Sequence, residues 1–283
     1  MIRFGMHASL WTTAWTRQGA ERAVGQAARY GLDVVEIPLL SPETVDVAHS
    51  RALFQRHNIA PTASLGLPRE ACAPLHPDKA EAFLTRALDV AHALGCHTLT
   101  GVTYSTLGYR SGRPPTEIEL ETVAKALRPV AKRAGGYGMT LGLEPCNRYE
   151  THILNTAAQA EILRERIGDP SVIIHLDTYH TNIEEKNFAA ALADGAGAVR
   201  YVHLSESDRG VPGSGAVHWQ EVMIALKNAS FEGDLVVESF VNMMPEIAGA
   251  LSVWRPVAQS AEEVLEIGLP FLKSLARAVG LTE

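Results

Sequence analysis

Cysteine, long apolar runs and clusters of basic residues are all scarce in this 283-residue sequence, and each shortage excludes a class of protein. Cys72, Cys96 and Cys146 are scattered and odd in number, so they predict neither a disulfide framework nor a thiolate metal site. No apolar run reaches about 18 residues, so we expect no membrane partner. The net charge of -7, without a basic tract, argues against a nucleic-acid partner.

Two further features are missing near the start of the chain. Residues Met1–His7 lack the basic-then-apolar layout of a signal peptide, so the sequence predicts a cytoplasmic protein with reduced cysteines. Residues Ala8–Thr13 follow the first apolar run and contain no glycine. An open doubly wound sheet would more often carry a Gly-rich phosphate loop at that point.

What the sequence does contain is a regular alternation of short apolar runs with longer segments of helical periodicity, such as Ala20–Tyr30, Asp78–Leu94 and Thr116–Arg133. Residues suited to a left-handed helix C-cap precede several runs, at Gly31, Asn58, Gly95, Gly138 and Gly168. The runs predict strands at Ile2–His7, Asp33–Ile37, Pro61–Gly66, Thr98–Thr103, Met139–Glu144, Val172–Asp177, Val199–His203 and Leu235–Glu238.

Eight strand-then-helix units in this length predict an α/β fold, the (β/α)8 TIM barrel. The open doubly wound sheet is the alternative. Because no low-complexity linker divides the chain, we expect residues 1–283 to form a single domain. In such a barrel the carboxyl ends of the strands meet at one face, and that face carries the chemistry.

Four consecutive strands are predicted to end on a metal-ligand type: Glu144, Asp177, His203 and Glu238. Any one of these residues alone could simply meet water at the strand end. Together they would converge at the mouth of a barrel, where three carboxylates without a cation would repel one another. Three hard oxygen ligands and one imidazole predict one divalent cation per subunit, Mn²⁺ first, with Mg²⁺ or Co²⁺ as alternatives.

Three longer segments carry a family signature. They are Glu144-Pro-Cys-Asn-Arg-Tyr-Glu150, His175-Leu-Asp-Thr-Tyr-His-Thr-Asn-Ile-Glu-Glu185 and His203-Leu-Ser-Glu-Ser-Asp-Arg209. They resemble the signature segments of the ketose 3-epimerases, which act on D-tagatose, D-allulose or L-ribulose and belong to the xylose-isomerase-like TIM barrels. The resemblance covers nearly the whole chain, and it implies the same four metal ligands.

The resemblance also implies that Glu144 and Glu238 are the catalytic acid/base pair. Inverting a carbon next to a ketone requires removal of its proton, and a cation stabilises the cis-enediolate that forms. One carboxylate takes the proton on one face, and an acid on the opposite face returns one. The sequence therefore predicts an isomerase, a metal-dependent epimerase acting on a free ketose at carbon 3.

Four other side chains are assigned to the substrate. The resemblance implies that Glu150, His180 and Arg209 hold the sugar's oxygens, while His7 stands where some members carry an aromatic ring in the pocket. On the residues alone, alternatives stay open. Glu150 could orient another side chain or form a surface salt bridge, His180 could cap the following helix, and Arg209 could be a solvated loop arginine.

The remaining candidates have plainer interpretations. His175 is expected to fill the barrel interior, and Glu36 either supports the site or is an ordinary rim carboxylate. Cys146, Leu107 and Ser205 depart from residues common in the family, and they affect the shape of the pocket and hence the preferred ketose.

Three other functions compete with the epimerase. An aldose–ketose isomerase of the same barrel group, acting on hydroxypyruvate or a tetrulose, would share the cation and the enediolate. A metal-dependent nuclease would need more histidines and a basic groove, which the acidic balance disfavours. A non-catalytic sugar-binding barrel would have little use for two opposed carboxylates. The resemblance implies a small ketose as partner and a homodimer or homotetramer.

Overall fold

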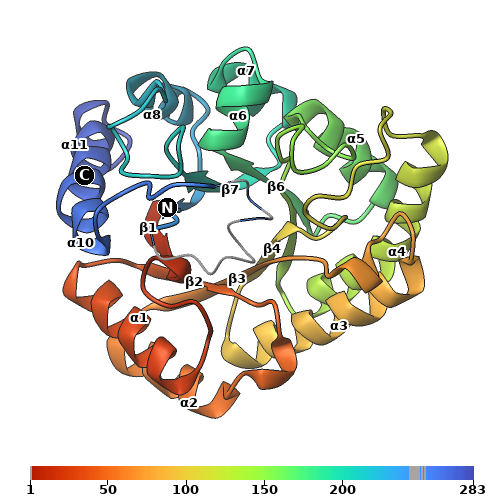
Figure 1. Cartoon of the computed structure of the whole chain (residues 1–283), viewed down its shortest axis with the longest axis horizontal. Helices are drawn as coiled ribbons and strands as arrows, with labels where there is room; N and C mark the ends of the chain where they lie inside the picture. Colours follow the sequence, from red (N-terminus) through yellow and green to blue (C-terminus); the bar gives the residue numbers. More distant parts are fainter. Residues whose placement is uncertain (1, 242–248, 250, 252) are drawn as a thin grey trace.

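The computed structural model describes residues 2–241, 249, 251 and 253–283. Eight parallel strands follow one another in sequence order and close into a barrel (Figure 1). This confirms the predicted (β/α)8 fold. The strands are β1 (Ile2–His7), β2 (Val34–Pro38), β3 (Ala60–Gly66), β4 (Thr98–Val102), β5 (Thr140–Leu143), β6 (Val172–Asp177), β7 (Val199–Leu204) and β8 (Gly233–Val237).

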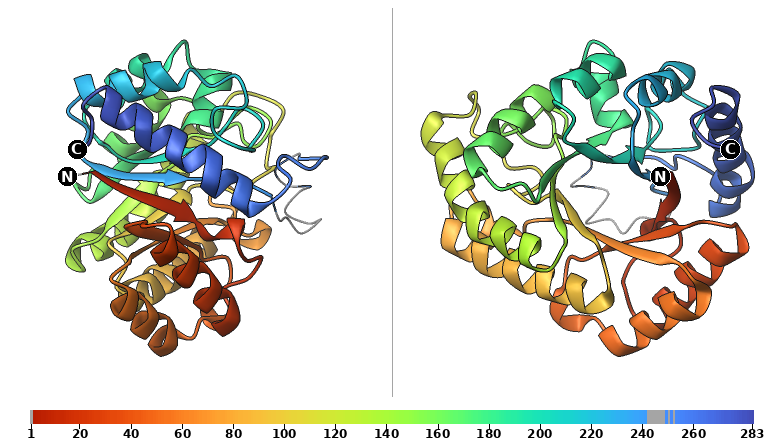
Figure 2. Two further views of the ribbon diagram at one scale, coloured as in Figure 1. Left: turned by 90° about the vertical axis from the view of Figure 1, so that its left-hand side faces the viewer. Right: turned by 180° about the vertical axis from the view of Figure 1, so that it is seen from behind.

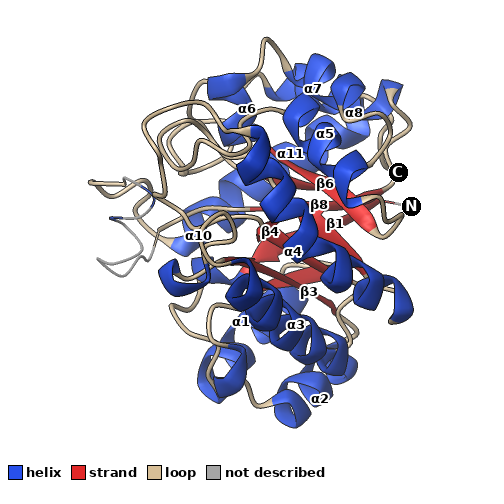
Figure 3. Cartoon of the chain, turned by 90° about the vertical axis from the view of Figure 1, so that its right-hand side faces the viewer, coloured by secondary structure: helices blue, strands red, loops and turns tan. Residues whose placement is uncertain are grey.

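Helices surround the barrel on its outside (Figure 3). The main ones are α1 (Arg17–Arg29), α2 (Val47–His57), α3 (Pro77–Leu94), α4 (Glu117–Gly136), α5 (Ala157–Ile167), α6 (Thr178–Glu184), α7 (Phe188–Asp194), α8 (Trp219–Asn228), α10 (Ala261–Glu263) and α11 (Leu269–Ala278). Short turns of other helix types are η1 (Ala8–Leu10), η2 (Pro42–Thr44), η3 (Arg69–Ala71) and η4 (Val264–Gly268). No helix of the described part is both long and apolar enough to cross a membrane.

Local signals in the sequence explain where these helices begin and end. Thr116 and Glu119 form a reciprocal capping box at the start of α4, and Thr156 and Gln159 form another at α5. The five predicted C-cap residues all adopt a left-handed backbone with positive φ, at Gly31, Asn58, Gly95, Gly138 and Gly168. Each helix therefore turns back into the next strand without strain.

β1 and β6 have the predicted boundaries, and the boundaries of the other six strands differ from the predicted ones by one or two residues. Glu144 and Glu238 lie directly after β5 and β8 instead of closing them. Asp177 ends β6 and is paired in register with His203 of β7. Both chain termini lie at the same end of the barrel (Figure 2), and the strands run away from them toward the opposite face.

Polar side chains fill part of the barrel interior. The Thr62 hydroxyl lies 2.8 Å from the Tyr201 hydroxyl, and Thr100 Oγ1 lies 3.0 Å from His175 Nδ1. Gly142 leaves room for this layer, because a Cβ atom there would lie 2.0 Å from Thr100 Oγ1. His175 is fully buried and hydrogen-bonded, as expected of a residue that fills the barrel.

An ionic cluster lies at the amino ends of the strands. Asp234 is buried there and accepts a hydrogen bond from Arg3 Nε at 2.7 Å. Its other oxygen lies 2.8 Å from His97 Nε2. This carboxylate–imidazole pair is remote from the carboxyl ends of the strands.

Candidate active site

A cavity of about 580 Å³ opens at the carboxyl ends of the strands. Its polar lining includes several of the residues predicted from the sequence, namely His7, Glu144, Glu150, His180, His203, Arg209 and Glu238. The loops that follow the strands supply most of the remaining wall, including Trp15, Leu67, Leu107 and Phe240. The mouth of the barrel therefore combines a charged floor with apolar sides.

The four predicted metal ligands meet at this floor. His203 Nδ1 lies 3.5 Å from Glu144 Oε1, 3.6 Å from Glu238 Oε1 and 3.8 Å from Asp177 Oδ2. This nitrogen is buried and has no hydrogen-bond partner within the described residues. Ligand atoms separated by 3.5–3.8 Å suit an ion held about 2.0–2.2 Å from each of them. Asp177, His203 and Glu238 offer ligand atoms that all lie within 4.8 Å of one another, and Glu144 adds a carboxylate oxygen 3.5 Å from the same nitrogen, so these side chains could hold a divalent cation.

Burial shapes the protonation of this cluster. It raises the pKa of Glu144 to about 7, although His203 acts in the opposite direction. Burial also disfavours the charge of Asp177, but Arg209 and His180 outweigh it and hold the pKa of Asp177 well below its ordinary value. One carboxyl of the site is therefore able to gain or lose a proton near neutrality, while its neighbour stays ionised.

Arg209 is a buried cation and not the solvated loop residue that was the alternative. Its Nη1 atom donates to Asp177 Oδ2 at 2.6 Å and also to Glu238 Oε2. The guanidinium carbon lies 4.0 Å from the centre of the Tyr179 ring and 5.2 Å from that of Phe240. Burial opposes its charge, but the two carboxylates raise the pKa of Arg209 above its ordinary value.

His180 faces the cavity in a defined tautomer. The main-chain N–H of Asn147 donates to His180 Nδ1 at 3.1 Å, which places the proton of the neutral ring on Nε2. Burial lowers the pKa of His180 to about 3, so the ring is neutral. Nε2 lies 3.1 Å from Nη2 of Arg209, so two donor groups point toward each other. An acceptor oxygen to one side of this pair, at hydrogen-bond distance from each nitrogen, would satisfy both.

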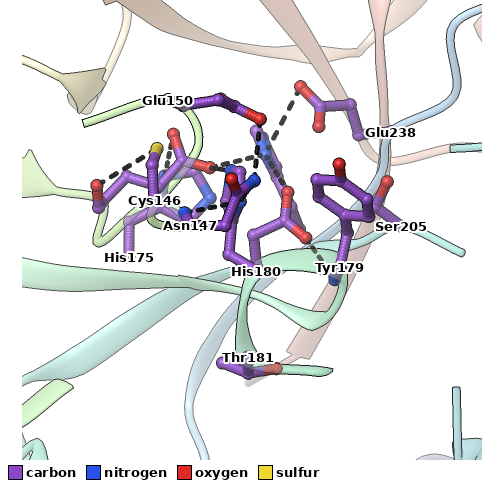
Figure 4. A network of polar contacts seen from close by, with 12 residues as sticks. Cys146, Asn147, Glu150, His175, Tyr179, His180, Thr181, Ser205 and Glu238 are labelled. Carbon is purple, nitrogen blue, oxygen red and sulfur yellow. Dashed lines mark hydrogen bonds and ion pairs between the residues drawn. The ribbon is translucent and has the colours of Figure 1, made fainter. Parts of the chain in front are cut away.

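Glu150 belongs to the same network and is not a surface salt bridge. It is buried, and its Oε1 atom accepts a hydrogen bond from Asn147 Nδ2 at 2.8 Å. Figure 4 shows Asn147 between Glu150 and His180, on the side of the site across from Glu238. The sequence interpretation missed Asn147, although it lies inside the Glu144–Glu150 signature segment.

His7 forms part of the wall. Its Nδ1 atom lies 2.5 Å from the Ser9 hydroxyl, and its ring packs edge-on against Phe240. Of the three residues that depart from the family pattern, Leu107 and Cys146 line the cavity, whereas Ser205 accepts a hydrogen bond from Arg209 at 3.2 Å. Two of the three therefore bear directly on pocket shape.

Glu36 supports the site and is not a rim carboxylate. It is fully buried on β2, where its Oε2 atom accepts a hydrogen bond from the Tyr201 hydroxyl at 2.6 Å. The same oxygen lies 2.7 Å from His203 Nε2. The sequence left this residue undecided, since its partners lie far away along the chain.

Comparison with known proteins agrees with this geometry. The family model described as "Xylose isomerase-like TIM barrel" matches residues 24–274, so the chain belongs to that family of barrels. It is 36% identical over 278 residues to the L-ribulose 3-epimerase of Methylomonas sp. (strain DH-1). This alignment covers 96% of this chain and 97% of the relative. It is 35% identical to the ketose 3-epimerase of Arthrobacter globiformis, over 100% and 99% of the two chains.

A solved structure shows the same relationship. The crystal structure of a D-allulose 3-epimerase from Methylomonas sp. in complex with D-allulose has a TM-score of 0.92, with 34% identity and 96% of each chain covered. Within the xylose isomerase-like barrels, the chain belongs to the ketose 3-epimerase family. It is therefore an isomerase-class, sugar-modifying enzyme.

Proposed function

We propose that this enzyme epimerises a free ketose at carbon 3 with the help of one divalent cation per subunit. The observation that carries the proposal is the position of Glu144 and Glu238, two carboxylates that approach the same unpartnered nitrogen of His203 from separate strands. Two opposed carboxylates are what removal and return of a proton on opposite faces of one carbon require. A sugar-binding protein without catalysis would gain nothing from them.

Glu144, Asp177, His203 and Glu238 would hold the cation. Three carboxylate oxygens and one imidazole form a hard ligand set, which favours Mn²⁺, with Mg²⁺ or Co²⁺ as alternatives. When bound, the cation supplies positive charge that stabilises the negative charge developing on the sugar's oxygens.

The carboxylates carry out the proton transfers. One of Glu144 and Glu238 removes the proton from carbon 3, which leaves a cis-enediolate, and the protonated partner returns a proton to the opposite face. Their roles exchange when the reaction runs backward. Proton removal needs an ionised carboxylate, and a cation held by Glu144 and Glu238 would favour the ionised form of either one.

The neutral ring of His180 and the cationic guanidinium of Arg209 position the sugar. His180 Nε2 and Arg209 Nη2 converge on one point, where a single substrate oxygen would accept from both. Glu150 Oε2 is buried without a hydrogen-bond partner in the described residues, so a sugar hydroxyl could donate to it. His7 contributes to the wall beside Phe240. We also propose that residues 1–283 form one domain of a cytoplasmic homodimer or homotetramer.

The test is a screen of fructose, tagatose, ribulose, xylulose and erythrulose with added Mn²⁺ in D₂O. We expect one or more of them to yield its carbon-3 epimer, with solvent deuterium at carbon 3 by NMR. Glu238→Gln should nearly abolish turnover in a folded protein, whereas Asp234→Asn, at the other end of the barrel, should not. An active Glu238→Gln variant contradicts the two-carboxylate scheme. An aldose product would instead identify an aldose–ketose isomerase.

A further inference from the structure

Glu36 is a buried carboxylate beside the site that the proposed reaction does not use. Its Oε2 atom contacts both Tyr201 and His203, at 2.6 and 2.7 Å. Its other oxygen lies 3.7 Å from His7 Nε2 and has no hydrogen-bond partner in the portion of the chain described here. Glu36 therefore reaches the floor of the cavity through imidazole rings.

A purely structural role explains this carboxylate poorly. An ion in the barrel interior carries a desolvation cost, and this one adds negative charge close to three further carboxylates. Packing alone would be served at lower cost by an apolar side chain.

The contact with His203 has a defined chemical consequence. A neutral imidazole that donates its Nε2 proton to a carboxylate keeps its lone pair on Nδ1, and a ligand of a cation must be in that neutral form. In His203 that Nδ1 atom is the one that faces Glu144, Asp177 and Glu238. The His203 ring also meets the His175 ring edge-on, with centroids 4.1 Å apart, which restricts its rotation.

We propose that Glu36 is a positioning residue, which fixes the tautomer and orientation of His203 so that Nδ1 is presented to the divalent cation. This inference rests on the proposed function, because it takes His203 as a ligand. Glu36 touches neither the sugar nor the reacting carbon. Its loss therefore weakens cation binding, and turnover lost at low Mn²⁺ should recover as the Mn²⁺ concentration is raised.

The experiment titrates Mn²⁺ into the ion-free protein and follows the free ion by electron paramagnetic resonance. Glu36→Gln keeps an acceptor oxygen but loses the charge, so we expect Mn²⁺ affinity to fall about tenfold. Glu36→Ala removes the acceptor as well, and we expect a loss of about a hundredfold. The matched control is Asp234→Asn, which alters a buried carboxylate bound to His97 Nε2 at 2.8 Å and should keep native affinity.

Native Mn²⁺ affinity in Glu36→Ala overturns the proposal, and so does an equal loss in Asp234→Asn. If Glu36→Ala does not fold, Glu36→Asp replaces it, and its shorter reach to His203 must still weaken Mn²⁺ binding. Sugar turnover of the native protein is measured in the same samples. If Mn²⁺ binding depends on Glu36 but the native protein epimerises no sugar, the proposed function alone is contradicted. If the native protein epimerises a sugar but the Glu36 variants bind Mn²⁺ with native affinity, this inference alone is contradicted.

Discussion

Replacing Arg209 by methionine removes a buried positive charge that two carboxylates share. Methionine keeps an unbranched stem of similar width, so the contacts with Tyr179 and Phe240 are partly retained. What is lost are the hydrogen bonds from Nη1 to Asp177 and Glu238. In the ion-free protein, both carboxylates then remain buried at the floor of the cavity without that cation.

Breaking a buried ion pair by removing one partner costs about 3–5 kcal/mol of unfolding free energy, because the other charge is left uncompensated. Two carboxylates lose their partner here, so we expect at least the lower value. At roughly 2 °C per kcal/mol for a large domain, the ion-free variant should unfold at least about 6 °C below the native protein. Saturating Mn²⁺ neutralises the same carboxylates and should recover most of that difference.

The assay is thermal unfolding at pH 8 with and without Mn²⁺, where the carboxyl groups of the site are ionised. Arg133→Met is the control, since Arg133 pairs with Asp89 at 2.6 Å on the surface with its side chain 44% exposed. An exposed pair contributes about 0–1 kcal/mol, so this control should change little in either condition. If Mn²⁺ raises the unfolding temperatures of native protein and Arg209→Met equally, the charge argument is wrong.

Three more outcomes can be measured. In urea unfolding of the ion-free proteins, the free energy of unfolding of Glu144→Gln should rise relative to native by on the order of 3 kcal/mol as the pH goes from 5 to 8. The reason is that the raised pKa of Glu144 stabilises the native fold only while that carboxyl is protonated, and glutamine stays neutral. Gly142→Ala should destabilise by about 1–3 kcal/mol through its clash with Thr100, whereas Gly25→Ala, whose Cβ meets no described atom within 4 Å, should stabilise by about 0.4–1 kcal/mol. Asn147→Ala removes the amide that donates to Glu150, so it should raise the KM for the ketose about tenfold. A tenfold change corresponds to about 1.4 kcal/mol of binding free energy.

The strands, and the meeting of the candidate ligands at one face, were predictable because their signals are local. β2 to β6 are buried apolar runs that each follow a helix ending near a left-handed residue, such as Gly138 before β5. Parallel strands of a barrel end at one face, so residues at or just after their ends meet without further information. For the strands, the errors are confined to boundaries. Thr103, for example, lies just past the end of β4, and its hydroxyl donates to the carbonyl of Gly142.

The undecided residues depend on partners remote in sequence. Glu36 accepts from Tyr201, which lies 165 residues away, so nothing near β2 indicates whether this carboxylate faces the rim or the interior. Asn147 holds His180 across 33 residues, and its role emerges only when the loops after β5 and β6 are brought together. Such contacts are a consequence of barrel closure, which periodicity and capping signals do not encode.

The inward direction of Arg209 has its own physical cause, in the loop after β7. Arg209 adopts a left-handed backbone with φ of 65°, and its carbonyl accepts from Phe240 N and the Ser239 hydroxyl, which ties the loop to the end of β8. Glu206 fixes the rest of the loop by accepting from Gly213 N at 2.8 Å and from other donors. The guanidinium is thus held by main-chain contacts as well as by the carboxylates it touches. We therefore expect it to stay in place when a cation takes over those carboxylates, with its free N–H groups directed at the sugar.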